Sequence, residues 1–157
     1  MSKFRFLLLF CLSFFSITAN ANFVFNENCI KAYKNILSLK FNEGALQIAQ
    51  EKKINPNNKI PVLLENYIDF LKVLTTENNA SFENFKSNKS ARISIIEDDD
   101  KRSPWYLYAA AEINLQSCIN RFKYLEFVSG AYELQKAYNL LEENQKKFPD
   151  FLPNKKS

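Results

Sequence analysis

The sequence contains no histidine, and this absence restricts the chemistry available to the chain near neutral pH. Acid–base catalysis would need a carboxylate, a lysine or a cysteine with a shifted pKa, because histidine is the side chain that ordinarily titrates there. No motif in the sequence selects such a residue. Only two glycines are present, too few for a loop that cradles phosphate groups. We therefore predict a protein without catalytic activity and without a cofactor.

Cysteine is also scarce. Cys11 lies near the start of the chain, which leaves Cys29 and Cys118 far apart in the remainder. Two separated cysteines cannot supply the four ligands of a zinc site without carboxylates, and the acidic run at residues 97–100 lacks the alternating ligands and the glycine of a calcium loop. No metal site is predicted. Cys29 and Cys118 could form a disulfide in an oxidising compartment, but buried free thiols on apolar helix faces are favoured.

Long apolar runs are confined to the beginning of the chain. Lys3 and Arg5 precede an apolar run at residues 6–17, and small residues lead to Ala21, as in a cleaved export signal. The alternative is an N-terminal membrane anchor, but this run is shorter than the roughly 20 residues that a spanning helix needs. We expect cleavage after Ala21, no transmembrane segment in the mature chain, and a helical domain over residues 22–148 followed by a tail at residues 149–157.

An excess of one charge is missing as well. Without Lys3 and Arg5, 19 of the 21 basic residues remain against 17 acidic residues, which gives a formal charge of +2. The two signs alternate along the chain, whereas binding to nucleic acid would need basic side chains gathered on one surface. The sequence therefore predicts solvated helix faces and no nucleic-acid partner.

Apolar residues at helical spacing are abundant, and they predict an all-α fold with six helices. Asn26 or Asn28 can cap the first helix, and Ser103 followed by Pro104 is a strong start for the fifth. A turn is expected at residues 41–43. A fourth helix is expected, with an extended segment at residues 92–96 as the alternative. The expected order is a helix to about residue 39, a second to about residue 54, a third from Pro61, a fourth over residues 82–96, a fifth over residues 104–122, and a sixth from the turn at residues 124–126 to about Lys147.

An internal repeat links the second helix with the sixth. A shift of 86 residues aligns the two glycines of the chain, Gly44 and Gly130, and their neighbours. Small residues at these positions predict a second helix that packs closely on the first, after a turn closed by an aromatic ring. The residues that carry the repeat are Phe41, Gly44, Ala45, Phe127, Gly130 and Ala131. With a middle hairpin over residues 60–96, the chain should form about three antiparallel helical hairpins.

The order of an aromatic, a small, a large apolar and a small residue in these helices resembles the second helices of tetratricopeptide repeats, although Glu51 occupies a small-residue position. More specifically, residues 103–156 look like the early region of exported tetratricopeptide-containing proteins of the Bacteroidota. The resemblance implies a right-handed α-solenoid in the periplasm or at the cell surface of a Gram-negative bacterium. Such proteins are generally longer, which implies that this chain is an N-terminal region or a truncated relative, its tail the start of a continuation.

The candidate binding residues are Trp105, Tyr106, Tyr108 and Glu112. Such aromatic residues could stack on a sugar or anchor a peptide, but at helical spacing they are also typical of a core. Glu112 lies on a mostly apolar helix, which suits the rim of a binding surface better than catalysis. We expect an interaction module that holds a protein or peptide on the concave face of its first helices. The alternatives are a helical carrier for an apolar small molecule or a sugar, and the first part of a larger scaffold.

Overall fold

The computed structural model describes residues 22–98, 101 and 103–155, so the predicted export signal and Cys11 lie outside the described residues. Within the described part, the chain folds into six α-helices and one short 3₁₀ turn, without a β-strand, and the predicted all-α class is confirmed. The elements are α2 (Glu27–Leu37), α3 (Phe41–Ile54), α4 (Ile60–Thr76), α5 (Asn79–Glu97), α6 (Pro104–Lys123), α7 (Phe127–Lys147) and η2 (Leu152–Lys155).

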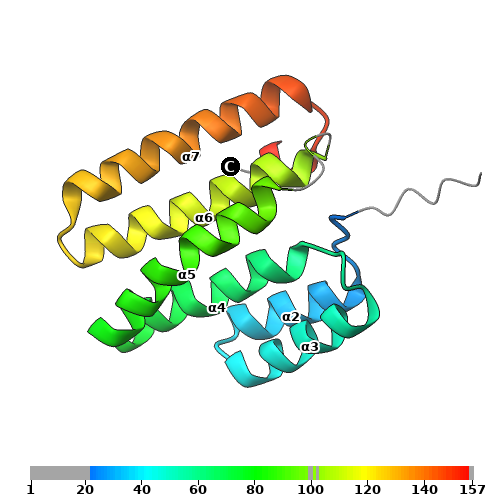
Figure 1. Ribbon diagram of the computed structural model, residues 1–157, viewed down its shortest axis with the longest axis horizontal. Helices are drawn as coiled ribbons and strands as arrows, with labels where there is room; N and C mark the ends of the chain where they lie inside the picture. Colours follow the sequence, from blue (N-terminus) through cyan, green and yellow to red (C-terminus); the bar gives the residue numbers. More distant parts are fainter. Residues whose placement is uncertain (1–21, 99–100, 102, 156–157) are drawn as a thin grey trace, which may run out of the picture.

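Consecutive helices pack as antiparallel pairs (Figure 1). We call them hairpin 1 (α2 and α3), hairpin 2 (α4 and α5) and hairpin 3 (α6 and α7). The first helices α2, α4 and α6 run in the same direction, and α4 contacts both of the others. None of the helices that the structure describes combines the length and apolar character required to cross a membrane.

Capping side chains set several helix starts. The side chain of Asn26 accepts a hydrogen bond from the backbone N–H of Cys29 at 3.1 Å, and that of Ser103 accepts one from Trp105 at 3.3 Å. These are two of the predicted caps. Such side chains satisfy backbone donors that have no partner inside the helix.

The position of the first turn is predicted wrongly. Residues 41–43 are the first turn of α3, and the connection is residues 38–40, where Leu39 has a φ of 59°. The left-handed position is usually occupied by glycine, and because leucine occupies it here, the sequence does not mark this turn. The predicted fourth helix is confirmed as α5, which continues to Glu97, so the alternative of an extended segment at residues 92–96 is not observed.

Both glycines lie where the two helices of a hairpin meet. A Cβ atom on Gly44 would be 2.7 Å from Cγ1 of Ile36, and one on Gly130 would be 2.4 Å from Cδ1 of Phe122. Real Cβ atoms do not approach other atoms so closely. The prediction that small residues let α3 and α7 pack closely on their partner helices is confirmed at these two positions.

The residues after the glycines behave differently. Ala45 and Ala131 are exposed, so the expectation that they line the inner face is wrong. Each helical residue is rotated by about 100° from the one before it, which turns these alanines away from the partner helix. Of the two turn aromatics, Phe41 is half-buried, whereas Phe127 is exposed and lies 6.2 Å from the ring of Phe122.

The main core is aliphatic and is shared by all three hairpins. Its fully buried members include Ile36, Ile60, Leu64, Ile96 and Ile113. Both described cysteines are buried free thiols on different hairpins, as favoured from the sequence. Burial and the nearby Glu51 raise the pKa of Cys29 to about 11.

A buried carboxylate ties the N-terminal segment to hairpin 1. Glu51 is only 1% exposed, and its oxygens accept hydrogen bonds from the side-chain amides of Asn26 (2.8 Å), Asn28 (3.2 Å), Asn55 (2.9 Å) and Asn58 (2.8 Å). Burial by itself would raise the pKa of Glu51, but these donors outweigh it and the pKa is lowered.

Asn58 extends this network to the residues before α2. Its side chain bonds both backbone groups of Val24, accepting from the N–H at 3.0 Å and donating to the carbonyl at 2.8 Å. The backbone N–H of Lys59 also donates to the carbonyl of Asn22 at 2.7 Å. Residues 22–26 are therefore held along hairpin 1, and this places Phe25 beside the first helices.

Candidate functional site

A groove lies on the face formed by the first helices, where α2, α4 and α6 meet the two ends of the described chain. Its inner part is a recess of about 130 Å³ lined by five aromatic rings and by aliphatic side chains of α4. It opens into a wider space of about 560 Å³ bordered by Glu112, Leu115, Leu152 and Pro153. We call the whole the aromatic groove, and its rings are those of Phe25, Tyr33, Tyr67, Trp105 and Tyr108.

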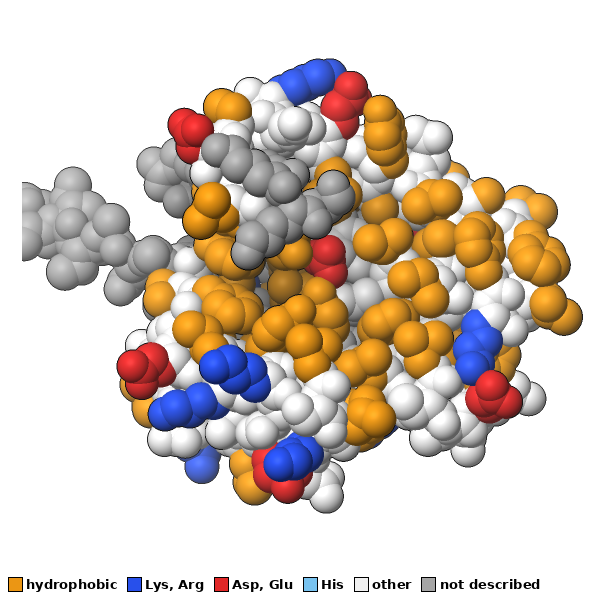
Figure 2. Space-filling view, turned by 180° about the vertical axis from the view of Figure 1, so that it is seen from behind, with side chains coloured by type: hydrophobic (Ala, Val, Ile, Leu, Met, Phe, Trp, Pro, Cys, Tyr) orange, Lys and Arg blue, Asp and Glu red, His pale blue; other side chains and the backbone are white. Residues whose placement is uncertain are grey.

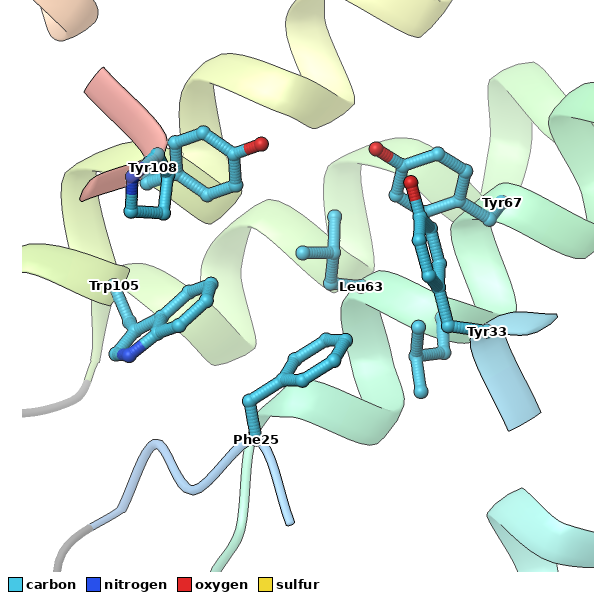
Figure 3. A pocket seen from close by; sticks show the side chains of 8 residues that line it. Phe25, Tyr33, Leu63, Tyr67, Trp105 and Tyr108 are labelled. Atoms are coloured by element: carbon cyan, nitrogen blue, oxygen red, sulfur yellow. The ribbon is translucent and has the colours of Figure 1, made fainter. Parts of the chain in front are cut away.

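The surface around this region is strongly apolar. Figure 2 shows a face dominated by hydrophobic side chains, with a hollow in which an acidic side chain is visible. Figure 3 shows the rings around the recess, with Tyr108 on one side, Tyr33 and Tyr67 on the other, and the hydroxyls of Tyr108 and Tyr67 directed toward the space between them.

Trp105 forms the end of the groove and joins the two ends of the described chain. Its ring stacks on Phe25 with centroids 5.6 Å apart and an angle of 7°, and Phe151 meets it edge-on at 4.9 Å. Tyr108 also contacts both Trp105 and Phe151, at 5.7 and 5.8 Å. One face of Trp105 is thus covered by the protein itself, and this residue has a framework role.

The middle of the groove is a cluster of three tyrosines around one carboxylate. Tyr33 and Tyr67 meet edge-to-face with centroids 5.4 Å apart, and the hydroxyl of Tyr67 donates to Oε2 of Glu112 at 2.5 Å. Tyr108 lines the same space as Glu112. Burial, and then the charge of Glu112, raise the pKa of both Tyr67 and Tyr108, so their hydroxyls stay protonated and act as donors.

Glu112 is the only charged residue that lines the aromatic groove among the residues the structure describes. It is half-buried, and it forms no ion pair within that part of the chain. Most other partly buried carboxylates do have a basic partner; Asp69, for example, lies 2.6 Å from Arg92. Among the side chains that the structure describes, the groove therefore presents an acidic group without a basic partner, surrounded by aromatic rings.

The structure brings three of the four predicted site residues together. Trp105, Tyr108 and Glu112 all line the groove, because they lie on one side of α6. Tyr106 does not: it is half-buried in the main core, and its pKa is raised by burial and by Glu97 and Glu143. One residue step along a helix turns the side chain by about 100°, which directs Tyr106 away from its neighbours.

Sequence reasoning missed the groove's other aromatic residues. Tyr33 and Tyr67 belong to the apolar stripes of α2 and α4, where they read as core, and Phe25 precedes the first helix. The fact that these two residues are tyrosines could have indicated a groove, because a buried tyrosine usually keeps its hydroxyl in contact with a polar group.

No group of three or more candidate ligands among the described residues could hold a metal ion. The chain was compared with models of known protein families, with curated proteins and with solved structures, and nothing matches it.

Proposed function

We propose that this protein is an exported helical-repeat interaction module that binds a segment of a partner polypeptide in the aromatic groove. In this proposal the hairpins form a right-handed, tetratricopeptide-like array, in keeping with the sequence resemblance. The observation that supports it most is that the groove is lined by the first helices of all three hairpins and is not closed off from solvent. Its tyrosines have the amphipathic character typical of residues that anchor protein interfaces.

The dimensions of the groove favour a polypeptide over a small molecule. The inner recess, about 130 Å³, holds the volume of only a few water molecules at about 30 Å³ each. Sites for small molecules generally occupy about 300–1,000 Å³ and bury most of the ligand. The larger space here, about 560 Å³, lies in the open part of the groove. A side chain in the recess with its backbone in the open part fits this shape better than the carrier alternative.

The chemistry of the groove supports binding rather than catalysis. The hydroxyl of Tyr67 is hydrogen-bonded to Glu112, and the raised pKa of Tyr67 and of Tyr108 keeps both hydroxyls protonated, so neither is available as a tyrosinate base. The lining that the structure describes holds no serine, cysteine or lysine beside it that could act as a nucleophile. The groove can donate hydrogen bonds, offer ring faces and present one negative charge.

Selection from a random peptide display library against residues 22–157 tests this proposal. We expect peptides with micromolar affinity. Replacement of the half-buried Tyr33 by alanine should lower their affinity about tenfold, because truncation of an interface anchor commonly costs more than 1 kcal/mol of binding free energy. Tyr138→Ala is the matched control, since Tyr138 is 60% exposed on α7, outside the groove. Trp105→Ala is a poor test because it removes the contacts of both chain ends. Failure to recover binders, or equal losses in both variants, would contradict the proposal.

A further inference from the structure

We propose that the aromatic groove selects a basic side chain of the bound polypeptide, lysine or arginine, with its cationic head between the tyrosine rings and the carboxylate of Glu112. This inference rests on the proposed function and names the chemistry that the groove recognises.

The charge of the groove favours a cation. Glu112 provides the only formal charge among the described lining residues, and none of the lysine and arginine side chains that the structure describes is paired with it. An acidic partner residue would be repelled there. An apolar one would remove water from the carboxylate without replacing its hydrogen bonds, which costs free energy. A cation is the group that gains from this site.

The ring arrangement also favours a cation. Tyr33, Tyr67 and Tyr108 surround the approach to Glu112, and Figure 3 shows them on two sides of one space. A cation within about 6 Å of an aromatic ring centroid is attracted by the electrons of the ring, and several rings around one space add to this attraction. Glu112 borders the wider space next to the recess, where an unbranched aliphatic stem can bring its cationic head to the carboxylate.

The same chain uses this combination elsewhere. Nζ of Lys86 lies 4.4 Å from the ring centroid of Phe82 and is paired with Glu83 at 2.8 Å and Glu126 at 3.0 Å. A ring and carboxylates thus hold an ammonium group at the turn of hairpin 3. In the aromatic groove, the rings and the carboxylate are in place and the cation is to be supplied by the partner.

Trp105 makes the inference measurable, because it is the only tryptophan of the chain and it lines the recess. The probe is N-acetyl-lysine N-methylamide, titrated into ¹⁵N-labelled residues 22–157 while the indole N–H signal is followed. The matched probe is the norleucine compound, which has a similar stem without the charge. We expect saturable shifts with millimolar affinity for the lysine probe, and about tenfold weaker binding of the norleucine probe.

Glu112→Gln keeps the shape of the side chain and an oxygen that accepts from Tyr67. This substitution should lower the affinity for the lysine probe about tenfold and leave the affinity for the norleucine probe unchanged. Glu43→Gln on the exposed side of α3 should change neither affinity. An unchanged ¹⁵N spectrum outside the groove will show that the variant is folded. Equal affinities for both probes, or an unaltered lysine affinity in Glu112→Gln, would overturn the inference.

The display selection separates this inference from the proposed function. Recovered peptides that bind through Tyr33 but carry no shared lysine or arginine would leave the interaction module intact and overturn cation selection. Enrichment of a basic residue whose contribution disappears in Glu112→Gln is the expected result. A library without binders would instead contradict the proposed function itself.

Discussion

Hairpin 1 and hairpin 3 are built on the same internal contacts. Their turns place Leu39 and Leu125, which are 86 residues apart, at φ values of 59° and 61°. In hairpin 1 the N–H of Lys40 donates to the carbonyl of Asn35 at 2.9 Å, and the equivalent bond in hairpin 3 is 2.8 Å long. The two glycines complete the match, since each approaches the residue eight positions earlier in its partner helix.

The two hairpins differ in what covers them. Ile36 and Ile48 are 0% and 3% exposed in hairpin 1, where α4 packs against both helices. Their equivalents in hairpin 3, Phe122 and Leu134, are 37% and 45% exposed. The repeated residues therefore encode the contact between the two helices of a hairpin, whereas burial of the outer apolar side chains depends on the neighbouring hairpin.

Position 51 marks the second difference. Glu51 corresponds to Ala137 in the 86-residue alignment, and both are almost fully buried. In hairpin 3 a methyl group suffices at this position. In hairpin 1 the carboxylate accepts hydrogen bonds from four asparagine amides. These bonds fix the segment before α2, and so they place Phe25 in the groove. The departure from the small-residue pattern thus has a structural purpose.

Glu51→Ala, which makes hairpin 1 resemble hairpin 3 at this position, should have the largest effect. It leaves several buried amides without their acceptor, and we expect a loss of about 3–4 kcal/mol in the free energy of unfolding in urea. Glu43→Ala, an exposed change on the same helix, should be close to neutral. A loss below about 1 kcal/mol would show that the network does not hold the segment.

The paired truncations Ile36→Ala and Phe122→Ala test the difference in coverage. Ile36 is fully buried, so its truncation should cost about 3 kcal/mol. Phe122 lies at the equivalent position but is partly exposed, so its truncation should lower the free energy of unfolding by only about 1 kcal/mol. Urea unfolding of both variants measures this gap. Equal losses would mean that hairpin 3 is covered as completely as hairpin 1.

The two glycines provide a smaller contrast. Alanine is favoured over glycine in a helix by about 1 kcal/mol, but its methyl group needs space. At Gly44 the obstacle is the fully buried Ile36, so Gly44→Ala should lose about 1–2 kcal/mol. At Gly130 the ring of Phe122 can turn toward solvent, and Gly130→Ala should be nearly neutral. Thermal unfolding compares the pair, and a reversed order would contradict the contact geometry.

The smallest predicted effect is on acid stability. The pKa of Glu51 is lowered in the fold from its ordinary value of 4.5. Its contribution to stability is therefore fully present above that value and is lost as the pH falls through the folded pKa. Urea midpoints measured between about pH 6 and pH 3 should fall less steeply in Glu51→Gln than in the unchanged chain. Parallel curves would show that Glu51 does not provide this dependence.

The helices could be predicted because their signals are local. The caps at Asn26 and Ser103 need only neighbouring residues to act. The turn of hairpin 1 was misplaced because Leu39 takes a conformation that leucine rarely adopts. Helix α5 was uncertain because its apolar residues are few, and they are buried mainly through contacts with α4 and α6.

The site was only partly predictable. Trp105, Tyr108 and Glu112 were found on one helix, but apolar spacing does not distinguish a side chain in the core from one that lines a groove. Tyr33 and Tyr67 line the groove because the three hairpins pack against one another, and this packing cannot be predicted from the sequence of each helix alone. Phe25 is positioned by the hydrogen bonds around Glu51, and the five residues of this network are spread over three segments of the chain.

The most direct test compares the two apolar surfaces of the molecule, the aromatic groove and the open face of hairpin 3. A lysine-containing peptide from the display selection should be added to ¹⁵N-labelled residues 22–157, and the amide shifts mapped onto the structure. The account predicts that the largest changes occur around Tyr33, Tyr67, Tyr108 and the indole of Trp105. Changes centred on Phe122, Leu134 and Tyr138 would place the binding surface on hairpin 3 and contradict the account.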